Sequence, residues 1–541
     1  MALFRKKTSP RRSKVRKTIA PNRLGRVKRV ANRRTLVSSL VWLAFVALSV
    51  CVIALDTRGR PEGGFAAAFT FRHVIPVTVV VVLMCVAGAI YIHHYQKRII
   101  RNHTRAISLA ALLGILLAAA KVAVLLTQQT LWATGSAVMA AIILTIAYSQ
   151  RFALGISLLY CILVCLAVGR TGDLHLFLTA AAGAGTCCFS LREIRTRIKL
   201  VSVSTLAAVV VFVAYMALAF LPRTQPVGEI FRQAGLHAAI TLIIGMLIQS
   251  ILPIIEKTFR IATSMTLLDY SDANQPLLRR LAMEAPGTFS HSLLVGAIAE
   301  AAAEAIGRNG LLCRVGAYYH DIGKINKPDY FIENQVGSDS RHKELSPAMS
   351  QLIIVGHVKD GIEMAKEYRL PVVIRQFIET HHGTTLVEFF YNEAIKKHDA
   401  EQAAADNTKK AVRATPPSES EFRYPGPKPR TKEAGIVMLA DSVEGAVRSL
   451  GDITPTRIDA VVHNIAMKRL QDGQFDECDL SLRELSQIET SISKTLAAHY
   501  HSRIAYPKRP DVPEGSSSGQ ARPQSAAPTV ARTGPGQRGN R

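Results

Sequence analysis

The chain has 541 residues, of which 49% are hydrophobic, and it carries a formal net charge of +26 at pH 7. This length exceeds one ordinary core, so we expect two or three domains. The charge is concentrated, since residues 1–35 hold 14 Lys and Arg and no Asp or Glu, directly before an apolar stretch. No aromatic interleaving or helix-turn-helix pattern accompanies this charge. It therefore favours an anchor on an anionic lipid surface and excludes nucleic acid as the expected partner.

Long apolar blocks follow one another from Leu36 to Ile255. A helix that spans a lipid bilayer needs about 20 mostly apolar residues. The sequence accordingly predicts about eight spans, at residues 36–55, 74–93, 106–126, 131–148, 152–169, 174–190, 200–221 and 236–255. The first block follows a long basic stretch and lacks a clear cleavage site, so we expect a retained helix and not a signal peptide.

The basic residues between these blocks predict the orientation. With the N-terminus inside, the inner connections 94–105, 149–151 and 191–199 hold nine basic residues and one acid. The outer connections hold six basic residues together with four acids. The positive-inside rule therefore favours a cytoplasmic N-terminus in the inner (plasma) membrane, and an even number of spans returns the C-terminal half to the cytoplasm.

Polar residues within the apolar blocks are sparse, which disfavours a transporter. Lys121 lies near the predicted outer end of its span, where we expect its side chain to reach the membrane surface. The histidines near span edges are interpreted as interfacial residues: His93, His94, His175 and His237. Six of the eight cysteines lie in the apolar blocks, and the absence of a CxxC pair predicts small packing residues in a reducing compartment.

The half of the chain after Glu256 has helical periodicity and few β-rich runs. It predicts helices at 292–308, 311–322, 347–367, 371–382, 433–450, 455–471 and 481–502. Residues 398–430 are polar and rich in proline, so we expect a mobile insertion followed by an extended turn. Residues 507–541 are rich in Pro, Gly, Ser and Arg and are expected to be disordered.

An unusual set of histidines and aspartates lies in apolar company within this helical half: His291, His320, Asp321, His357, His381, His382 and Asp441. Burying so many ionisable groups is costly unless they pair or bind a metal. Imidazole and carboxylate ligands without a thiolate suit Fe, Mn, Co or Zn, and seven candidates suit two ions, which a carboxylate such as Asp321 can bridge. The pattern therefore predicts metal-assisted phosphoester hydrolysis.

Two basic residues are candidates for contacts with a substrate phosphate. Lys324 comes three residues after Asp321, and could also assist the leaving oxygen. Arg448 comes seven residues after Asp441, on the same face of the predicted helix. For both residues an ordinary solvated side chain is the alternative.

These motifs resemble the HD-domain phosphohydrolase superfamily, whose pattern is H…HD…D. The match is closest to the seven-transmembrane receptors with an intracellular HD domain, the group of the PgpH-type cyclic di-AMP phosphodiesterases. It rests on APGTFSHSL, HDIGK, HKELSPAMSQLIIVGHVKDG, FIETHHGTTLVEFFY and FRYPGPKPRTKEAGIVMLADSVEGAVR, and it covers roughly residues 200–505.

The resemblance implies two metal-binding sets. His291, His320, Asp321 and Asp441 would hold one ion, and His357, His381 and His382 the other, with Asp321 as the bridge. It further implies iron or manganese as the metal and cyclic di-AMP, opened to pApA, as the substrate. His342 matches a histidine typical of the family and is a candidate for substrate binding.

The sequence departs from this family in two places. Only residues 56–73 separate the first two spans, where relatives carry a large extracellular domain. The insertion at 398–421 lies between His382 and Asp441 and could change access to the site or its regulation. Neither departure removes a proposed ligand.

Three alternatives to this function stay open. A cyclic di-GMP phosphodiesterase of the HD-GYP type would carry a GYP segment after the paired histidines, which HHGTTLVEFFYNEA lacks. A single-metal (p)ppGpp or nucleotide hydrolase would leave the second set of histidines without a purpose. A catalytically silent nucleotide receptor has no need for all seven ligands.

The expected fold is all-α, a polytopic membrane bundle of about eight spans followed by a cytoplasmic all-α HD domain. The expected divisions are a basic segment (1–35), the transmembrane region (36–255), a connector (256–285), the HD domain (286–506) and the tail (507–541). Any signal from the membrane would pass through the connector, and a homodimer formed there is compatible with the sequence.

Overall fold

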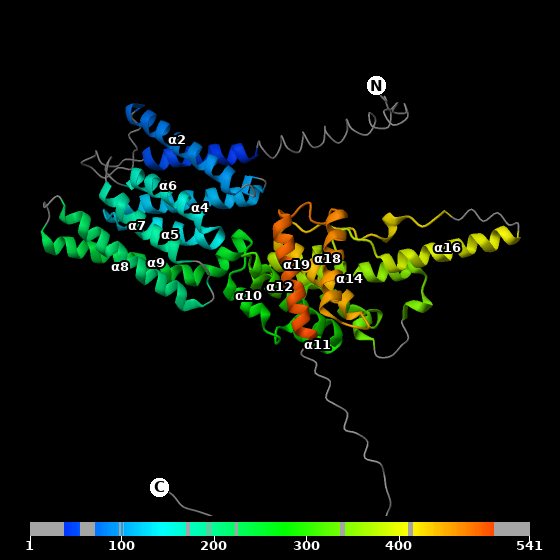
Figure 1. Cartoon of the computed structure of the whole chain (residues 1–541). Helices are drawn as coiled ribbons and strands as arrows, with labels where there is room; N and C mark the ends of the chain where they lie inside the picture. The colour runs from blue at the N-terminus through cyan, green and yellow to red at the C-terminus, as the bar shows by residue number, and fades with distance from the viewer. Residues whose placement is uncertain are drawn as a thin grey trace, which may run out of the picture.

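The computed structural model describes residues 37–54, 71–96, 99–100, 102–168, 174–191, 194, 196–221, 226–335, 341–408 and 415–501. Every regular element in these ranges is a helix, and their one isolated β-bridge joins Leu386 to Arg423. The helices form an N-terminal bundle and a C-terminal helical domain (Figure 1). The all-α prediction is confirmed. The predicted segments 1–35 and 507–541 lie outside the described residues.

Each of the eight predicted spans falls on one helix of the bundle. They are the helix Val37–Ala54, α2 (Phe71–Tyr95), α4 (His103–Thr127), α5 (Leu131–Ala147), α6 (Gln150–Val168), α7 (Leu174–Ser190), α8 (Arg197–Phe220) and α9 (Val227–Phe259). Six of these described helices are long and apolar enough to cross a membrane, and α5 and α7 are shorter apolar helices of 17 residues each. The chain is a multi-pass membrane protein.

Helix α5 forms the centre of the bundle, where it packs against α4, α6, α7 and α9. Small residues allow this close approach, as is typical of helix packing in membranes. At the contact of α8 with α9, a Cβ added to Gly245 would lie 1.8 Å from the Ser204 hydroxyl oxygen, so only glycine fits there. Large apolar side chains such as Ile115 and Leu126 instead point outward, toward the surrounding lipid.

Two polar residues of the bundle differ from the sequence interpretation. Lys121 is buried, and its ammonium donates to the carbonyl oxygen of Ala167 at 2.6 Å. His237 is also fully buried, and its Nδ1 lies 2.9 Å from the Thr134 hydroxyl. The placement of both at the membrane surface was wrong, because neighbouring helices supply hydrogen-bond partners inside the bundle. The exposed His93 and His94 lie at the end of α2, as expected.

The connector is attached by side-chain hydrogen bonds to the end of α9. Helix α9 runs for 33 residues and ends at Phe259, and the capping residue Arg260 that follows has a left-handed backbone with φ of 53°. The Glu256 carboxylate then accepts hydrogen bonds from the Thr263 N–H and the Thr266 hydroxyl, at 2.7 and 2.8 Å. These bonds fix the start of α10 (Ser264–Ser271) against the end of α9.

The seven predicted helices of the C-terminal half are present, with ends that differ from the predicted ones by at most six residues. They are α12 (Pro286–Ala305), α13 (Gly310–Tyr319), α14 (Pro347–Glu367), α15 (Val372–Thr380), α17 (Lys432–Arg448), α18 (Pro455–Gln471) and α19 (Leu482–His501). Two further helices were not predicted, α11 (Pro276–Glu284) and α16 (Glu388–Thr408). Short 3₁₀ helices follow α13, at Ile322–Asn326, Pro328–Tyr330, Ile332–Asn334 and Arg341–Glu344, and a further one covers Glu419–Phe422.

One part of the predicted insertion is helical. Helix α16 continues to Thr408, ten residues beyond the predicted boundary at 398, because the run AEQAAAD consists largely of strong helix formers. Figure 1 shows α16 projecting from the side of the C-terminal domain. Residues 409–414 lie outside the described part of the chain. The expectation of an irregular segment from residue 398 was therefore wrong for its first part.

Two apolar cores hold the C-terminal domain together. One joins α12, α13, α15, α17, α18 and α19, and the other joins α10, α11, α13, α14 and α15. Helices α13 and α15 contribute to both cores, through residues such as Ala317 and Phe377 to the first and Val315 and Ile374 to the second. The polar residues at the C-terminal ends of α13 and α15 are consequently held in place from two sides.

Candidate metal centre

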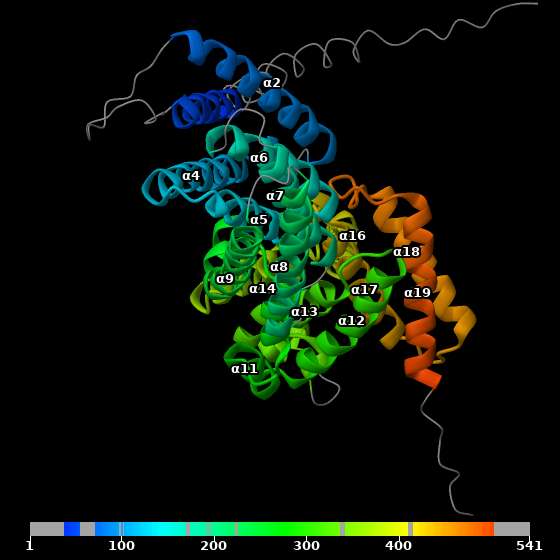
Figure 2. The same cartoon turned by 90° about the vertical axis from the view of Figure 1, so that its left-hand side faces the viewer.

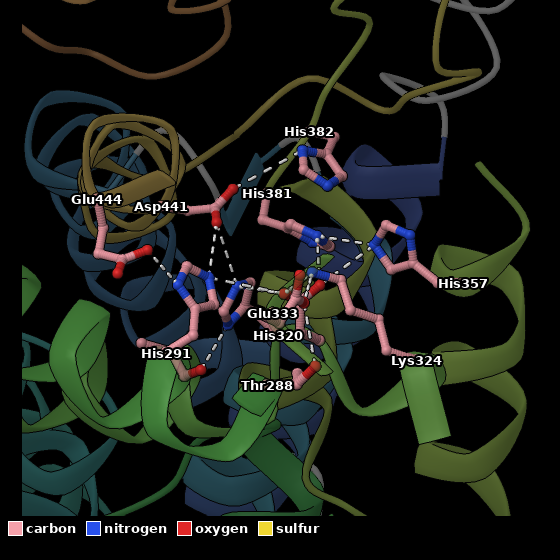
Figure 3. A network of polar contacts seen from close by, with 12 residues as sticks. Thr288, His291, His320, Lys324, Glu333, His357, His381, His382, Asp441 and Glu444 are labelled. Carbon is pink, nitrogen blue, oxygen red and sulfur yellow. Dashed lines mark hydrogen bonds and ion pairs between the residues drawn. The ribbon is translucent and has the colours of Figure 1, made fainter. Parts of the chain in front are cut away.

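The seven predicted ligands converge from five helices (Figure 3). His291 lies on α12, His357 on α14 and Asp441 on α17, whereas His320 and Asp321 follow α13 and His381 and His382 follow α15. Five of the seven are buried, and Asp441 and His382 lie at the more open side, with 11% and 22% of their side chains exposed. Access to the cluster is therefore from the side of Asp441 and His382.

The ligand atoms form two groups that share one residue. The first contains His291, His320, Asp321 and Asp441, and the second contains Asp321, His357, His381 and His382, with the atoms of each group within 4.8 Å of one another. The two oxygens of Asp321 face different groups. Oδ2 lies 3.2 Å from His320 Nε2, whereas Oδ1 lies 3.3 Å from His357 Nε2 and 3.5 Å from His381 Nε2. This carboxylate has the position that a bridge between two ions requires.

The backbone fixes the tautomers of three histidines. The Nδ1 atom of His320 donates to Ala317 O at 2.6 Å, that of His357 to Ile354 O at 2.5 Å, and that of His381 to Ile378 O at 3.0 Å. A neutral imidazole with its proton on Nδ1 offers a lone pair at Nε2. These lone pairs face the Asp321 carboxylate, and His357 Nε2 lies 3.2 Å from His381 Nε2.

Acceptors that face one another in a buried site need a cation between them. The His320 Nε2 and Asp321 Oδ1 atoms have no hydrogen-bond partner among the described residues, although both are buried. The donor set is imidazole nitrogen and carboxylate oxygen, which suits divalent transition metals. The residues present therefore fit a pair of divalent metal ions.

The electrostatics of the cluster also favour added positive charge. Burial lowers the tendency of His320 to protonate, but the carboxylates of Asp321 and Asp441 outweigh burial and raise the pKa of this imidazole to about 10. Burial lowers the pKa of His357 to about 3, although Asp321 opposes this change. The two carboxylates thus favour positive charge beside His320, whereas burial keeps His357 neutral with a lone pair available for a cation.

Lys324 forms the cationic side of the cluster. Its Nζ atom lies 2.7 Å from Asp321 Oδ2 and 2.7 Å from Glu333 Oε1. Glu333 also accepts a hydrogen bond from the Thr288 hydroxyl on α12, at 3.0 Å. Burial opposes the charge on Lys324, but the two carboxylates outweigh burial and raise its pKa. An ammonium has three N–H donors, so one remains for another acceptor.

Gly323 allows this arrangement to form. A Cβ at this position would lie 1.9 Å from the carbonyl oxygen of His357 and 2.5 Å from the backbone nitrogen of Gly361. Any side chain would therefore push α14, which carries His357, away from Asp321. The glycine of the HDIGK run is thus required by close backbone packing.

A carboxylate that the sequence analysis did not select supports His291. Glu444 Oε2 lies 2.5 Å from His291 Nδ1, which leaves His291 Nε2 pointing toward Asp441 Oδ1 at 3.1 Å (Figure 3). Arg448 Nη2 lies 3.8 Å from the same Glu444 oxygen, and its side chain is 38% exposed. Glu444 comes three residues after Asp441, a spacing that places both on one face of α17 and could have indicated this contact.

The open side of the cluster carries Tyr424 and Arg469. The Tyr424 ring stacks on the His382 ring with centroids 4.3 Å apart. Arg469 donates to the Ser442 hydroxyl at 3.1 Å, while burial lowers its pKa and the Asp441 carboxylate opposes that change. His342 belongs to neither group. It is half-buried, lies 2.8 Å from Tyr330 O through Nε2, and packs against Phe390.

The fold and the site define a class: a membrane-anchored helical protein with an HD-type metal centre. Residues 71–263 match the model described as "7TM receptor with intracellular HD hydrolase", and residues 288–446 match the model for the HD domain. The first match covers α2 and α4 to α9, which are seven apolar helices among the described residues, and the helix Val37–Ala54 precedes it. The chain therefore resembles the seven-transmembrane receptors with an intracellular HD hydrolase domain in both its membrane half and its C-terminal half.

The chain is similar to the cyclic-di-AMP phosphodiesterase PgpH of Bacillus subtilis, with 47% identity over 264 residues, which are 49% of this chain and 35% of that protein. It is 41% identical to PgpH of Listeria monocytogenes over 48% of this chain and 34% of that protein. A solved structure of the L. monocytogenes PgpH HD domain has 42% identity and a TM-score of 0.38, and covers 42% of this chain and 100% of its own. The chain thus spans about a third of the length of these curated relatives.

Proposed function

We propose that this chain is a membrane-anchored, metal-dependent phosphodiesterase that hydrolyses cyclic di-AMP to pApA. The observation that carries the proposal is the shared carboxylate: Asp321 lies between two groups of ligands, each with three further members. The names of the two PgpH relatives support the same substrate. The residues that would hold the ions are those of the two groups, with iron or manganese as the expected metal.

In this proposal each part of the cluster has a defined task. Two divalent ions would supply positive charge beside the attacked phosphorus and would lower the pKa of the attacking water. Asp321 would contribute a ligand to both groups and so fix their relative positions. Lys324 donates one N–H to Asp321 and another to Glu333. The third N–H of Lys324 can donate to a phosphate oxygen or to the leaving oxygen. Tyr424 and Arg469 flank the open side and are positioned to line the approach of the nucleotide.

The proposed roles of two other predicted residues follow from their surroundings. Arg448 contacts Glu444, so we expect it to support His291 indirectly and not to bind a phosphate. His342 packs with Tyr330 and Phe390, and this aromatic group could contact a nucleobase. The catalytic domain would lie in the cytoplasm, because the basic residues of the connections favour an inside N-terminus.

The test uses the full chain in detergent, loaded anaerobically with Fe(II) or Mn(II). Cyclic di-AMP and cyclic di-GMP are followed in parallel by chromatography, with the variant His320→Ala/Asp321→Ala as the blank. Faster opening of cyclic di-AMP to pApA, absent from the blank, supports the proposal. Faster hydrolysis of cyclic di-GMP than of cyclic di-AMP would show that cyclic di-GMP is the substrate instead. Two bound metals per chain without turnover of either nucleotide would favour a silent nucleotide receptor.

A further inference from the structure

A cavity of about 370 Å³ lies in the membrane bundle between the helix Val37–Ala54, α2, α4 and α6. Its walls are mostly apolar and include Trp42, Phe45, Leu109, Leu113 and Leu163. This volume lies within the range of sites that bind small molecules. The cavity shares no residue with the two groups of metal ligands.

The two outer helices that close this cavity are loosely packed. Only 17% of the span Val37–Ala54 and 6% of that in α2 are buried, against 56% in α6. Both helices lie at the edge of the bundle in the two views (Figures 1 and 2). Their polar attachments include the bonds from Trp42 Nε1 to Cys85 O and from Tyr91 OH to Arg151 O, at 3.3 and 2.6 Å. The cavity is therefore bounded by helices that can separate at small cost.

Lipid is the natural occupant of a cavity with these walls. An apolar cavity has few polar partners for water, and the outer faces of the same helices expose large apolar residues such as Leu43 and Leu83 to the bilayer. The cavity extends from Ser38 to Phe45 along the first helix, which is roughly 11 Å at the helical rise of about 1.5 Å per residue. This length fits part of one acyl chain.

The charge around the cavity selects the headgroup. Its lining residues come from the start of the first helix, the end of α2 and the start of α4, which all lie at one end of the bundle. Arg105 directly precedes the lining residue Ala106, and Arg151 lies in the first turn of α6. In the sequence, a segment with 14 basic residues (1–35) comes shortly before this first helix. An anionic headgroup is complementary to this surrounding charge.

We propose that the cavity binds one acyl chain of an anionic phospholipid, with its phosphate at the basic end of the bundle. The lipid would join the two loosely packed helices to α4 and α6. This inference concerns the membrane half alone, so its failure would leave the proposed hydrolysis of cyclic di-AMP untouched.

The chain contains a built-in probe of this site. It has two tryptophans, and Trp42 lines the cavity, whereas Trp132 lies at the start of α5. In a Trp132→Phe background, Trp42 fluorescence reports only on lipid near the cavity. The chain is reconstituted in phosphatidylcholine–phosphatidylglycerol vesicles of fixed composition, with bromine on the acyl chains of either lipid.

We expect brominated phosphatidylglycerol to quench Trp42 with roughly fivefold greater apparent affinity than brominated phosphatidylcholine, as one cation–headgroup contact would give. High salt should reduce the difference, because it screens exposed charges. Equal quenching by both lipids would mean ordinary boundary lipid, and an absence of quenching would mean that a second copy or another part of this chain fills the cavity. Either result overturns the proposal.

Pairs of variants on the same helix distinguish loss of the lipid from the cavity from a general disturbance of the bundle. Ala110→Phe fills the cavity and should abolish the selective quenching, whereas Ala111→Phe places the same ring on the exposed face of α4 and should preserve it. Ala89→Phe and Ala87→Phe form a second such pair on α2. Selective quenching that survives both cavity-filling variants, in protein with unchanged metal content, would also overturn the proposal.

Discussion

Histidines are buried in both halves of the molecule, but their surroundings differ. His237 in the membrane bundle has a hydroxyl partner, Thr134, and contacts the ring of Tyr215. In the C-terminal domain, by contrast, His320, His357 and His381 surround the single carboxylate of Asp321. One buried imidazole is readily accommodated by a neighbouring helix, whereas a cluster of imidazoles and carboxylates requires a bound cation.

The same comparison applies to two lysines, of which Lys121 is buried and Lys324 is mostly covered. Lys121 in the bundle donates to the backbone carbonyl of Ala167. Lys324 in the domain lies between two carboxylates, and its side chain is 13% exposed. Burial alone therefore does not indicate function. Function is indicated instead by charged groups that converge from several helices. Variants of these groups should therefore lose metal or activity, whereas variants of isolated charged residues should not.

The largest effect is expected from Asp321→Asn. The amide keeps the size of the side chain but removes the charge that both groups of ligands share and that Lys324 pairs with. We expect loss of metal from both groups and a fall in kcat/KM of roughly 10³-fold or more, which is about 4 kcal/mol of transition-state stabilisation. Metal analysis and chromatographic hydrolysis assays measure the two effects. The matched control is Asp459→Asn, on the exposed face of α18.

Retention of both metals together with a tenth of the activity in Asp321→Asn would show that the carboxylate is not a bridge. The control should behave as the unmodified chain in both assays, because Asp459 contacts neither group.

A smaller and more selective effect is expected from His357→Ala. This change removes one member of the second group and leaves His291, His320 and Asp441 in place. We expect the metal content to fall from about two ions to about one per chain, with an activity loss of roughly 10²-fold, because the remaining ion cannot clamp both oxygens of the displacement.

The control for that variant is His342→Ala, because His342 is a nearby histidine outside both groups. Its metal content should stay unchanged, whatever its effect on nucleotide binding. A content of about one ion per chain in both the unmodified protein and His357→Ala would instead indicate a single-metal site formed by the first group alone.

Glu444→Gln tests how a residue that contacts a ligand, and not the metal itself, changes the metal affinity of the first group. The carboxylate lies behind His291 and orients its ring, and such partners of metal-binding histidines typically change metal affinity by about 10- to 100-fold. We expect a loss near the lower end of this range, because the glutamine carbonyl can still accept from Nδ1. Competition with a chromophoric chelator gives the affinity, and Glu367→Gln at the exposed end of α14 is the control. Unchanged affinity would assign Glu444 a purely structural role.

The sequence alone predicted much of this molecule where local signals are strong. Helices α14 and α18 have the predicted bounds because Ser346 and Thr454 cap them and a proline follows each cap. The order and types of the seven predicted ligands were readable, although their binding of metal stays a prediction. Tyr424 was not readable, because its partner His382 lies far away in the sequence and only the packed domain brings the two rings together. For Glu444 the only signal was its spacing from Asp441, which does not reveal its partner His291.

The buried Lys121 and His237 were misplaced for a related reason. Hydropathy gives the position of a residue along a span, but not the neighbouring helix that its side chain faces. The partners Ala167 and Thr134 belong to other spans, so their hydrogen bonds become visible only once the bundle is assembled.

The smallest effect is expected from Glu484→Gln, at a structural ion pair away from both groups. Glu484 pairs with Lys432 of α17 and accepts hydrogen bonds from the N–H and hydroxyl of Ser481, which caps the start of α19. The Lys432 ammonium, together with the Ser481 N–H, lowers the pKa of Glu484 to about 2. Because the folded-state pKa is depressed, the stabilisation is present above the ordinary carboxyl pKa of about 4.3 and is lost as pH falls toward about 2.

At pH 7 we expect the variant to exchange α19 amide hydrogens about fivefold faster than the unmodified chain, corresponding to about 1 kcal/mol. The ratio of the two exchange rates should approach one near pH 2. Glu489, which pairs with the exposed His463, offers the comparison Glu489→Gln on the same helix. A ratio for Glu484→Gln that stays constant from pH 7 to pH 2 would show that the change acts through packing and not through the charge of this carboxylate.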